Sequence, residues 1–272
     1  MAQGRAIEAQ APGVSRRGVA AGLLAAPLAA SPLAAAAAAL PLVGGPRQVL
    51  ISYRCDAARR PAFRRYMAGE HLRRLGALKA QGALNEYQVL FNPYAELGAW
   101  DAMMVLDFKR FADTARWTEI ERTSPGGLTP AGLALARPLQ TYSVDLAWTA
   151  TAPDPGPPAD RVFYAIPYSY AALGTYKQYV DDYVIPQVTG WIAEGVLSRY
   201  RIYLNRYPVG DPWDSLFLYD YRNLEAFGRR DEVVARVRKP LEAIPAWQHL
   251  NEIKGALRTE SENTIAELLG GG

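Results

Sequence analysis

Residues 80–108, AQGALNEYQVLFNPYAELGAWDAMMVLDF, match residues 193–221, AEGVLSRYRIYLNRYPVGDPWDSLFLYDY, at a constant offset in residue number. Nine of the 29 positions are identical. In the first stretch these are Ala80, Gly82, Leu84, Tyr87, Asn92, Tyr94, Trp100, Asp101 and Asp107. The similarity extends without a gap over residues 49–117 and 162–230. An internal repeat of this length indicates the architecture before any single element is assigned.

Each repeat has the pattern of a β-α-β-β-α-β unit. Apolar residues spaced by three or four positions from Phe63 to Leu78 predict a helix, and alternating side chains from Glu86 to Asn92 predict a strand. Both faces of the following strand are apolar, so we expect it to be buried on both sides. The first copy has predicted strands at 49–54, 86–92, 100–108 and 141–147 and helices at 63–78 and 109–122. The second has strands at 162–166, 199–205, 213–221 and, less distinctly, 250–257, with helices at 176–191 and 224–238.

Two tandem units of this kind resemble the ferredoxin-like fold. A fused pair resembles the dimeric α/β-barrel superfamily, an α+β architecture in which helices cover the outer face of each sheet and the inner faces meet. The resemblance implies a pseudo-dimeric α/β barrel. Members of the superfamily include EthD-like and NIPSNAP-like proteins, antibiotic-biosynthesis monooxygenases, haem-binding chlorite dismutases and dye-decolorising peroxidases. Because their functions differ, the resemblance predicts a fold and not a reaction.

The chain divides into five predicted segments. The two repeats occupy residues 47–149 and 161–260. A linker at 150–160 separates them, because four prolines within residues 150–159 favour a stiff, extended chain. Residues 261–272 form a C-terminal tail, which we expect to be a loose helix ending in frayed glycines.

Residues 1–39 have the pattern of an export signal. Arg16 and Arg17 precede an Ala-rich stretch without charged residues, and Ala35, Ala37 and Ala39 offer small-residue cleavage sites. The arginine pair indicates the Tat pathway and a periplasmic or secreted protein. The alternative is an Ala-rich membrane anchor. Since no later stretch is apolar enough to span a membrane, we expect no stable membrane insertion after the signal is removed.

The composition excludes several classes of function. Three arginines and one glutamate lie in residues 1–39, which leaves 27 basic and 26 acidic residues elsewhere. This balance does not favour a nucleic-acid partner. Cys55 is the only cysteine, so the chain has no intrachain disulfide. The oligomeric state does not follow from the sequence.

His71 is the candidate catalytic residue. It lies between Met67 and Leu75 on the apolar stripe of the first helix, where the second repeat has Val184. A titratable group among core positions needs a partner. His71 either faces the space between the sheets, as a base that contacts a ligand or as a metal ligand, or is a structural histidine bonded to a nearby carboxylate or carbonyl.

The candidate ligand-binding residues lie mostly on one strand of the second repeat. Arg199, Arg201, Tyr203 and Asn205 share one face of this strand. If that face points inward, its two guanidinium groups suit a carboxylate or phosphate. If the strand lies at a sheet edge, the charges are a solvated surface that blocks aggregation.

Trp100 and Trp213 are the remaining ligand-binding candidates, since aromatic side chains suit an organic ligand. Each is followed by aspartate, and the two Trp-Asp pairs equally fit a folding constraint.

We predict no metal and no cofactor. The two histidines, His71 and His249, and the single cysteine lack metal-ligand spacing. Haem remains an alternative through an axial imidazole, but the G-x-x-D-G motif of dye-decolorising peroxidases is absent.

Three function hypotheses follow. The first is an exported protein that binds or transforms a small organic molecule in a pocket between the two sheets. The second is a non-enzymatic structural or interaction module with a filled barrel core. The third, a nucleic-acid binder, conflicts with the charge balance and the export signal. A sealed, apolar interior would favour the second hypothesis over the first.

Overall fold

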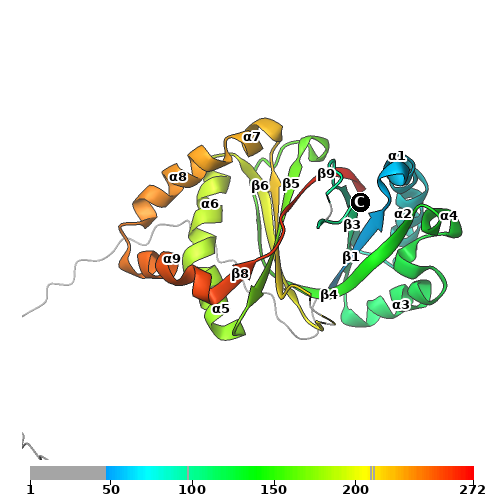
Figure 1. Ribbon diagram of the computed structural model, residues 1–272, viewed down its shortest axis with the longest axis horizontal. Coiled ribbons are helices and arrows are strands. Elements are labelled where there is room, and N and C mark those ends of the chain that lie inside the picture. Colours follow the sequence, from blue (N-terminus) through cyan, green and yellow to red (C-terminus); the bar gives the residue numbers. More distant parts are fainter. Residues whose placement is uncertain (1–46, 97, 209, 211) are drawn as a thin grey trace, which may run out of the picture. The chain divides into compact units, whose positions relative to one another are not determined.

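The computed structural model describes residues 47–96, 98–208, 210 and 212–272 (Figure 1). The predicted signal, residues 1–39, lies outside the described residues. The elements of the first half are β1 (Arg47–Cys55), η1 (Ala57–Arg59), α1 (Arg60–Tyr66), the π-helical turn η2 (Met67–His71), α2 (Leu72–Ala80), β2 (Glu86–Phe91), β3 (Ala102–Phe108), η3 (Phe111–Asp113), α3 (Thr114–Thr123), η4 (Pro125–Gly127), α4 (Pro130–Leu133) and β4 (Ala136–Thr151).

The second half follows a similar order. Its elements are η5 (Pro158–Asp160), β5 (Val162–Tyr170), α5 (Leu173–Tyr179), the π-helical turn η6 (Val180–Val184), α6 (Ile185–Ala193), β6 (Leu197–Asn205), β7 (Ser215–Tyr221), α7 (Leu224–Gly228), α8 (Arg230–Leu241), α9 (Pro245–Leu257), β8 (Arg258–Glu260) and β9 (Thr264–Gly271). The constant offset of the sequence repeat reappears in these bounds. Helix α1 begins at residue 60 and α5 at 173, and β3 begins at 102 and β7 at 215.

Eight antiparallel strands close into a barrel in the order β7-β6-β4-β1-β3-β2-β9-β5, with β5 pairing back to β7. Two strands join the halves: β4 pairs with β1 and with β6, and β9 pairs with β2 and with β5. The short strand β8 pairs with the end of β5, beyond the residues of β5 that pair with β9. Because each of the eight strands has two neighbours, the closed sheet has no free edge among them.

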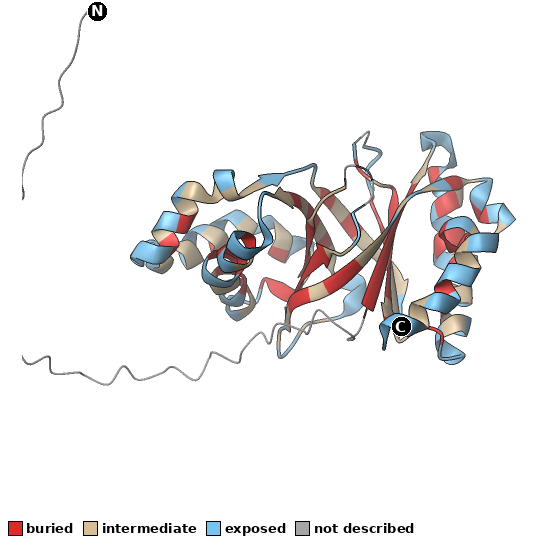
Figure 2. Ribbon diagram, turned by 90° about the horizontal axis from the view of Figure 1, so that it is seen from below, coloured by how far each residue is buried: buried red, intermediate tan, exposed pale blue. Residues whose placement is uncertain are grey.

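The barrel wall separates an interior from two helical layers. In Figure 1, α1 to α4 lie outside one part of the wall and α5 to α9 outside the other. Alternate residues of each strand point to opposite sides. On β3, Met103 and Val105 pack inside the barrel, whereas Met104 and Leu106 pack under the helices. The expectation that this strand is buried on both faces is confirmed, and Figure 2 shows the buried residues concentrated in the strands.

The C-terminal part of the chain differs from our expectations. Residues 250–257, expected as a strand, belong to helix α9, which begins at Pro245 and buries Trp247 and Leu250 on one side. Residues 261–272, expected as a loose helical tail, contain β9. This strand forms because the barrel otherwise leaves β2 and β5 unpaired on one side, and backbone groups need partners.

The terminal glycines are paired, not frayed. Gly272 donates to and accepts from the backbone of Tyr87 at 3.0 and 2.9 Å. A Cβ atom on Gly271 would lie 2.7 Å from the carbonyl oxygen of Tyr87, so close strand pairing requires glycine there. The predicted linker is also shorter than expected, since residues 150 and 151 still belong to β4.

Candidate functional site

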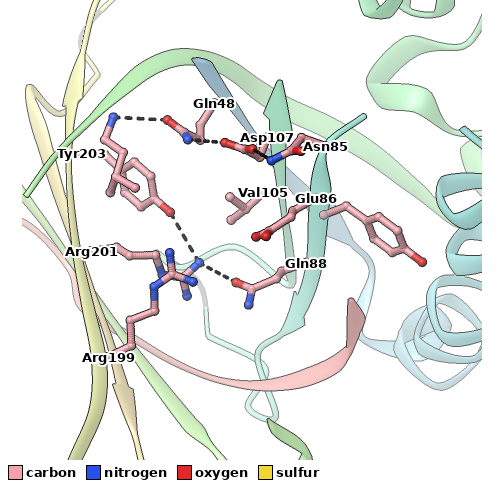
Figure 3. Close-up of a pocket in the computed structure, with 11 residues that line it drawn as sticks. Gln48, Asn85, Glu86, Gln88, Val105, Asp107, Arg199, Arg201 and Tyr203 are labelled. Carbon is pink, nitrogen blue, oxygen red and sulfur yellow. Dashed lines mark hydrogen bonds between the residues drawn. The ribbon is translucent and has the colours of Figure 1, made fainter. Parts of the chain in front are cut away.

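A polar cavity of about 220 Å³ opens at the end of the barrel where β2 and β6 begin (Figure 3). Five strands and the turn before β2 supply its wall. The lining residues are Gln48, Asn85, Glu86, Tyr87, Gln88, Val105, Asp107, Leu146, Arg199, Arg201 and Tyr203. Three of the predicted ligand-binding residues, Arg199, Arg201 and Tyr203, therefore meet in one cavity.

The inward orientation of this face follows from the position of β6. Strand β6 pairs with β4 on one side and β7 on the other, so it is not a sheet edge. Tyr200, Ile202 and Leu204 pack under the helices, which leaves the alternate residues for the interior. Arg201 and Tyr203 are buried, with 3% and 1% of their surface exposed. The alternative of a solvated edge strand was wrong.

Arg201 is held by three partners inside the barrel. Its guanidinium forms an ion pair with Asp220 at 2.8 Å. It also donates to the side-chain carbonyl of Gln88 and, at 3.5 Å, to the hydroxyl of Tyr203. Burial alone would lower the pKa of Arg201, but Asp220 and Tyr203 more than offset this and raise it. Arg201 is therefore a charged, largely neutralised part of the wall.

Arg199 differs because its guanidinium makes no hydrogen bond or ion pair with the residues that the structure describes. It is half-buried, and its Nε is sealed from solvent without an acceptor. Burial lowers the pKa of Arg199, and the neighbouring charge of Arg201 lowers it further. A partly desolvated cation without a close counterion is costly, so an anion bound in the cavity would be stabilised there.

Two carboxylates lie across the cavity from the arginines. Asp107 accepts hydrogen bonds from the side-chain amides of Asn85, at 2.6 Å, and Gln48. Burial raises the pKa of Asp107, and the two amides partly offset that rise. Glu86 is exposed at the rim, and Figure 3 shows its carboxylate pointing into the cavity. The wall thus carries opposite charges on opposite sides.

The two predicted tryptophans line a different cavity. Trp100 and Trp213 lie at the opposite end of the barrel, in a space of about 410 Å³. The rings of Trp213 and Tyr142 are 4.5 Å apart. Met103 and Leu216, both buried, contribute to the apolar part of the lining. An apolar core that includes Leu50, Val144 and Leu218 fills the barrel between the two cavities.

Asn205 lines neither of these cavities, and its side chain is hydrogen-bonded to the backbone of the loop before β7. Its amide donates to the carbonyl of Trp213 at 3.1 Å, as Asn92 donates to the carbonyl of Trp100 at 3.3 Å. Asp101 pairs with Arg60, which agrees with the structural interpretation of the Trp-Asp pairs. The repetition of Asn92 and Asn205 reflects this loop geometry.

His71 does not face the space between the sheets. It is 1% exposed in the core between α1 and the outer face of β3. Its Nε2 lies 3.3 Å from the Met104 sulfur, and its Nδ1 has no hydrogen-bond partner among the described residues. No carboxylate or carbonyl of the described residues is bonded to the ring, contrary to the structural interpretation. Burial lowers the pKa of His71 to about 4, with a smaller contribution from Arg74, so the imidazole is neutral at pH 7.

His249 is exposed on α9. Neither histidine lines the polar cavity or the cavity that contains Trp100 and Trp213. Among the described residues, no cluster of three or more His, Cys, Asp or Glu side chains could hold a metal. The placement of the two imidazoles does not fit an axial haem ligand in either cavity.

No protein-family model matches the sequence, and no curated protein matches it. Solved structures do resemble it. A proposed monooxygenase from Lactobacillus acidophilus superposes with a TM-score of 0.51 and 12% identity, covering 84% of this chain and 96% of that one. An anthrone oxidase-like protein superposes with a TM-score of 0.55 and 8% identity, covering 84% of this chain and 92% of that one. A proposed monooxygenase from Fusobacterium nucleatum superposes with a TM-score of 0.50 and 8% identity, covering 85% of this chain and 95% of that one.

The fold is that of the dimeric α/β-barrel proteins. At these identities the similarity concerns the fold alone. No helix in the described part of the chain is long and apolar enough to cross a membrane.

Part of the polar cavity was not foreseen from the sequence. Gln48, Asn85 and Asp107 line it, although no local sequence pattern marks them as ligand-binding candidates. A signal was present: residues 86 and 88 occupy the repeat positions of 199 and 201, so the same inward face of the first repeat should complete the wall. Only the barrel closure shows that the two faces meet.

Proposed function

We propose that this protein binds or transforms a small organic molecule in the polar cavity inside the barrel. The observation that carries the proposal is Arg199, a half-buried guanidinium in the cavity wall without a hydrogen bond or ion pair to the described residues. Convergent polar groups in a concave site are typical of ligand pockets. A volume of about 220 Å³ lies below the roughly 300–1,000 Å³ of pockets for drug-sized ligands, which favours a compact molecule.

The proposal includes a duplication. Two tandem ferredoxin-like units, originally alike, account for element bounds that recur at a constant offset along the chain. One unit has kept Glu86 and Gln88, whereas the other has Arg199 and Arg201 at the same positions. A fused pair can lose symmetry, because a change in one unit is not imposed on the other. We infer that this divergence created the binding site.

We also propose that the protein works in the periplasm or outside the cell, after Tat export and removal of residues 1–39. The arginine pair and the uncharged, Ala-rich stretch support this. Replacing Arg16 and Arg17 together by lysine should leave the uncleaved chain in the cytoplasm. Correct processing of this variant in the periplasm would contradict the Tat route.

Oxidation of the bound molecule is the reaction class to examine first, because two of the similar structures are described as monooxygenases and one as anthrone oxidase-like. We propose no resident cofactor. Any such reaction would then need an oxidant from solution, such as dioxygen, to accept the electrons that the bound molecule gives up.

The test is native mass spectrometry, with an absorption spectrum, of protein purified from its own cell envelope or medium. We expect an organic mass that leaves on denaturation and no Soret band. A matched Arg199→Gln preparation should hold less of this molecule.

The second hypothesis, a structural module, is supported by the apolar residues that fill the middle of the barrel. It predicts a chain without any retained molecule, whose melting temperature is unchanged by a broad set of acids, bases and neutral compounds. That pair of results would overturn the proposed binding function.

A further inference from the structure

Glu86 and Arg199 occupy the same position in the two repeats and carry opposite charges in one cavity. Neither forms a hydrogen bond or an ion pair with the residues that the structure describes. Each still influences the cavity electrostatically, since Glu86 raises the pKa of Arg199 after the larger lowering effects of burial and Arg201. The two groups therefore interact electrostatically across the cavity without direct contact.

The other charged groups of the wall already have partners. Arg201 is paired with Asp220, and Asp107 accepts from two side-chain amides. A ligand that approached these groups would compete with existing hydrogen bonds. It would gain most from Arg199 on one side and Glu86 on the other, because their hydrogen-bonding capacity is unused.

We propose that the polar cavity selects a compact organic molecule with two features: a carboxylate that binds Arg199 and a hydrogen-bond donor, hydroxyl or amine, that faces Glu86. This inference rests on the proposed function and specifies its ligand class. The arginine fork provides planar, bidentate recognition of the carboxylate. Glu86 repels a molecule that presents a second anion. Arg199 therefore selects for one carboxylate, and Glu86 selects against a second.

A matched series of probes tests each feature. The compounds are 4-hydroxybenzoate, which has both groups, benzoate, which lacks the donor, and 4-hydroxybenzamide, which lacks the charge. Binding is measured by isothermal titration calorimetry on the mature chain after dialysis to remove small molecules. We expect 4-hydroxybenzoate to bind more tightly than the other two.

Two variants separate the roles. Arg199→Gln should weaken 4-hydroxybenzoate by about tenfold to a hundredfold, as expected for a lost charged hydrogen bond. Glu86→Gln should weaken 4-hydroxybenzoate but strengthen benzoate, because the repulsion of its carboxylate is removed. Arg229→Gln is the control, since Arg229 is half exposed on the surface and only loosely paired with Glu232 at 3.9 Å. It should leave all three affinities unchanged.

Equal affinity of wild type and Arg199→Gln for 4-hydroxybenzoate would overturn the inference, as would preferential binding of 4-hydroxybenzamide. If no probe binds, the inference is tested by the chemical class of the molecule that the protein retains in native mass spectrometry. A retained carboxylate that is lost in Arg199→Gln supports the inference, and a retained neutral or cationic molecule overturns it. If nothing is retained and no compound binds, the proposed function itself has failed.

Discussion

Arg201 donates a hydrogen bond to the side chain of Gln88, the residue that occupies its own position in the first repeat. Equivalent positions of the two repeats thus touch across the barrel. Trp100 and Trp213, another such pair, line one cavity together at the opposite end. The interior is consequently built from pairs of equivalent positions, and a difference between the repeats becomes a difference between opposing walls.

The Arg201–Asp220 pair should make a large contribution to stability. Asp220 is fully buried, so Arg201→Met leaves a buried carboxylate without its counterion. We expect the free energy of unfolding in urea to fall by about 3–5 kcal/mol. Gln88→Leu, which removes a neutral acceptor from the charged Arg201, should cost less, about 1.5–3 kcal/mol. Similar losses in the two variants would contradict a dominant role for the ion pair.

His71 should make the protein sensitive to acid. Its pKa is about 4 in the folded state and about 6.5 in an unfolded chain. The unfolded state therefore binds the proton first, and stability is lost as the pH falls from about 6.5 towards 4. The maximum loss from this group is of the order of 3 kcal/mol.

The measurement is the free energy of unfolding against pH for wild type, His71→Val and His249→Ala. His71→Val should be less stable at pH 7 but should lose less stability on acidification. His249→Ala is the control, because it also removes a histidine but from an exposed position. An unchanged slope in His71→Val would show that other groups cause the acid sensitivity.

The sequence pattern predicted the elements well where the repeat applies. Apolar spacing located α1 and α2, and alternation placed Val89 and Phe91 on the face of β2 that packs under the helices. These signals are local, since they depend on which residues of one helix or strand are apolar. Whether Arg199 and Arg201 point inward could not be decided this way, because a polar strand face looks the same at a sheet edge and beside an internal cavity.

The missed strand β9 has a similar cause. The first repeat ends in β4, and the same constant offset places its counterpart across most of α9, the short strand β8 and the turn before β9. The added helix α9 displaces the last strand to residues 264–271, beyond the range where the repeat is visible. Its pairing with β2 and β5 is a long-range contact that no local pattern encodes.

Gly82 and Gly195 should be equally sensitive to substitution. Both end a helix with a positive φ, +70° and +74°, and an added Cβ would meet no atom within 4 Å at either position. Replacement by alanine therefore adds backbone strain alone, about 1–2 kcal/mol. Gly174→Ala is the control, because Gly174 lies in α5 without positive φ or a close contact, and alanine there should be neutral or stabilising. Urea denaturation of the three variants checks this, and a tolerated Gly82→Ala would refute it.

Deleting residues 261–272 should open the barrel. Among the described strands, β9 is the one that pairs with β2 on the side away from β3, so its loss exposes unpaired edges on β2 and β5 and favours edge-to-edge association. We expect oligomers by size-exclusion chromatography with light scattering and loss of a cooperative urea transition. Glu267→Ala, which removes only the exposed pair with Arg64 at 2.8 Å, should remain folded and lose less than about 1 kcal/mol. If the truncated chain has the same hydrodynamic size and unfolding midpoint as the full chain, β9 is not required to close the barrel.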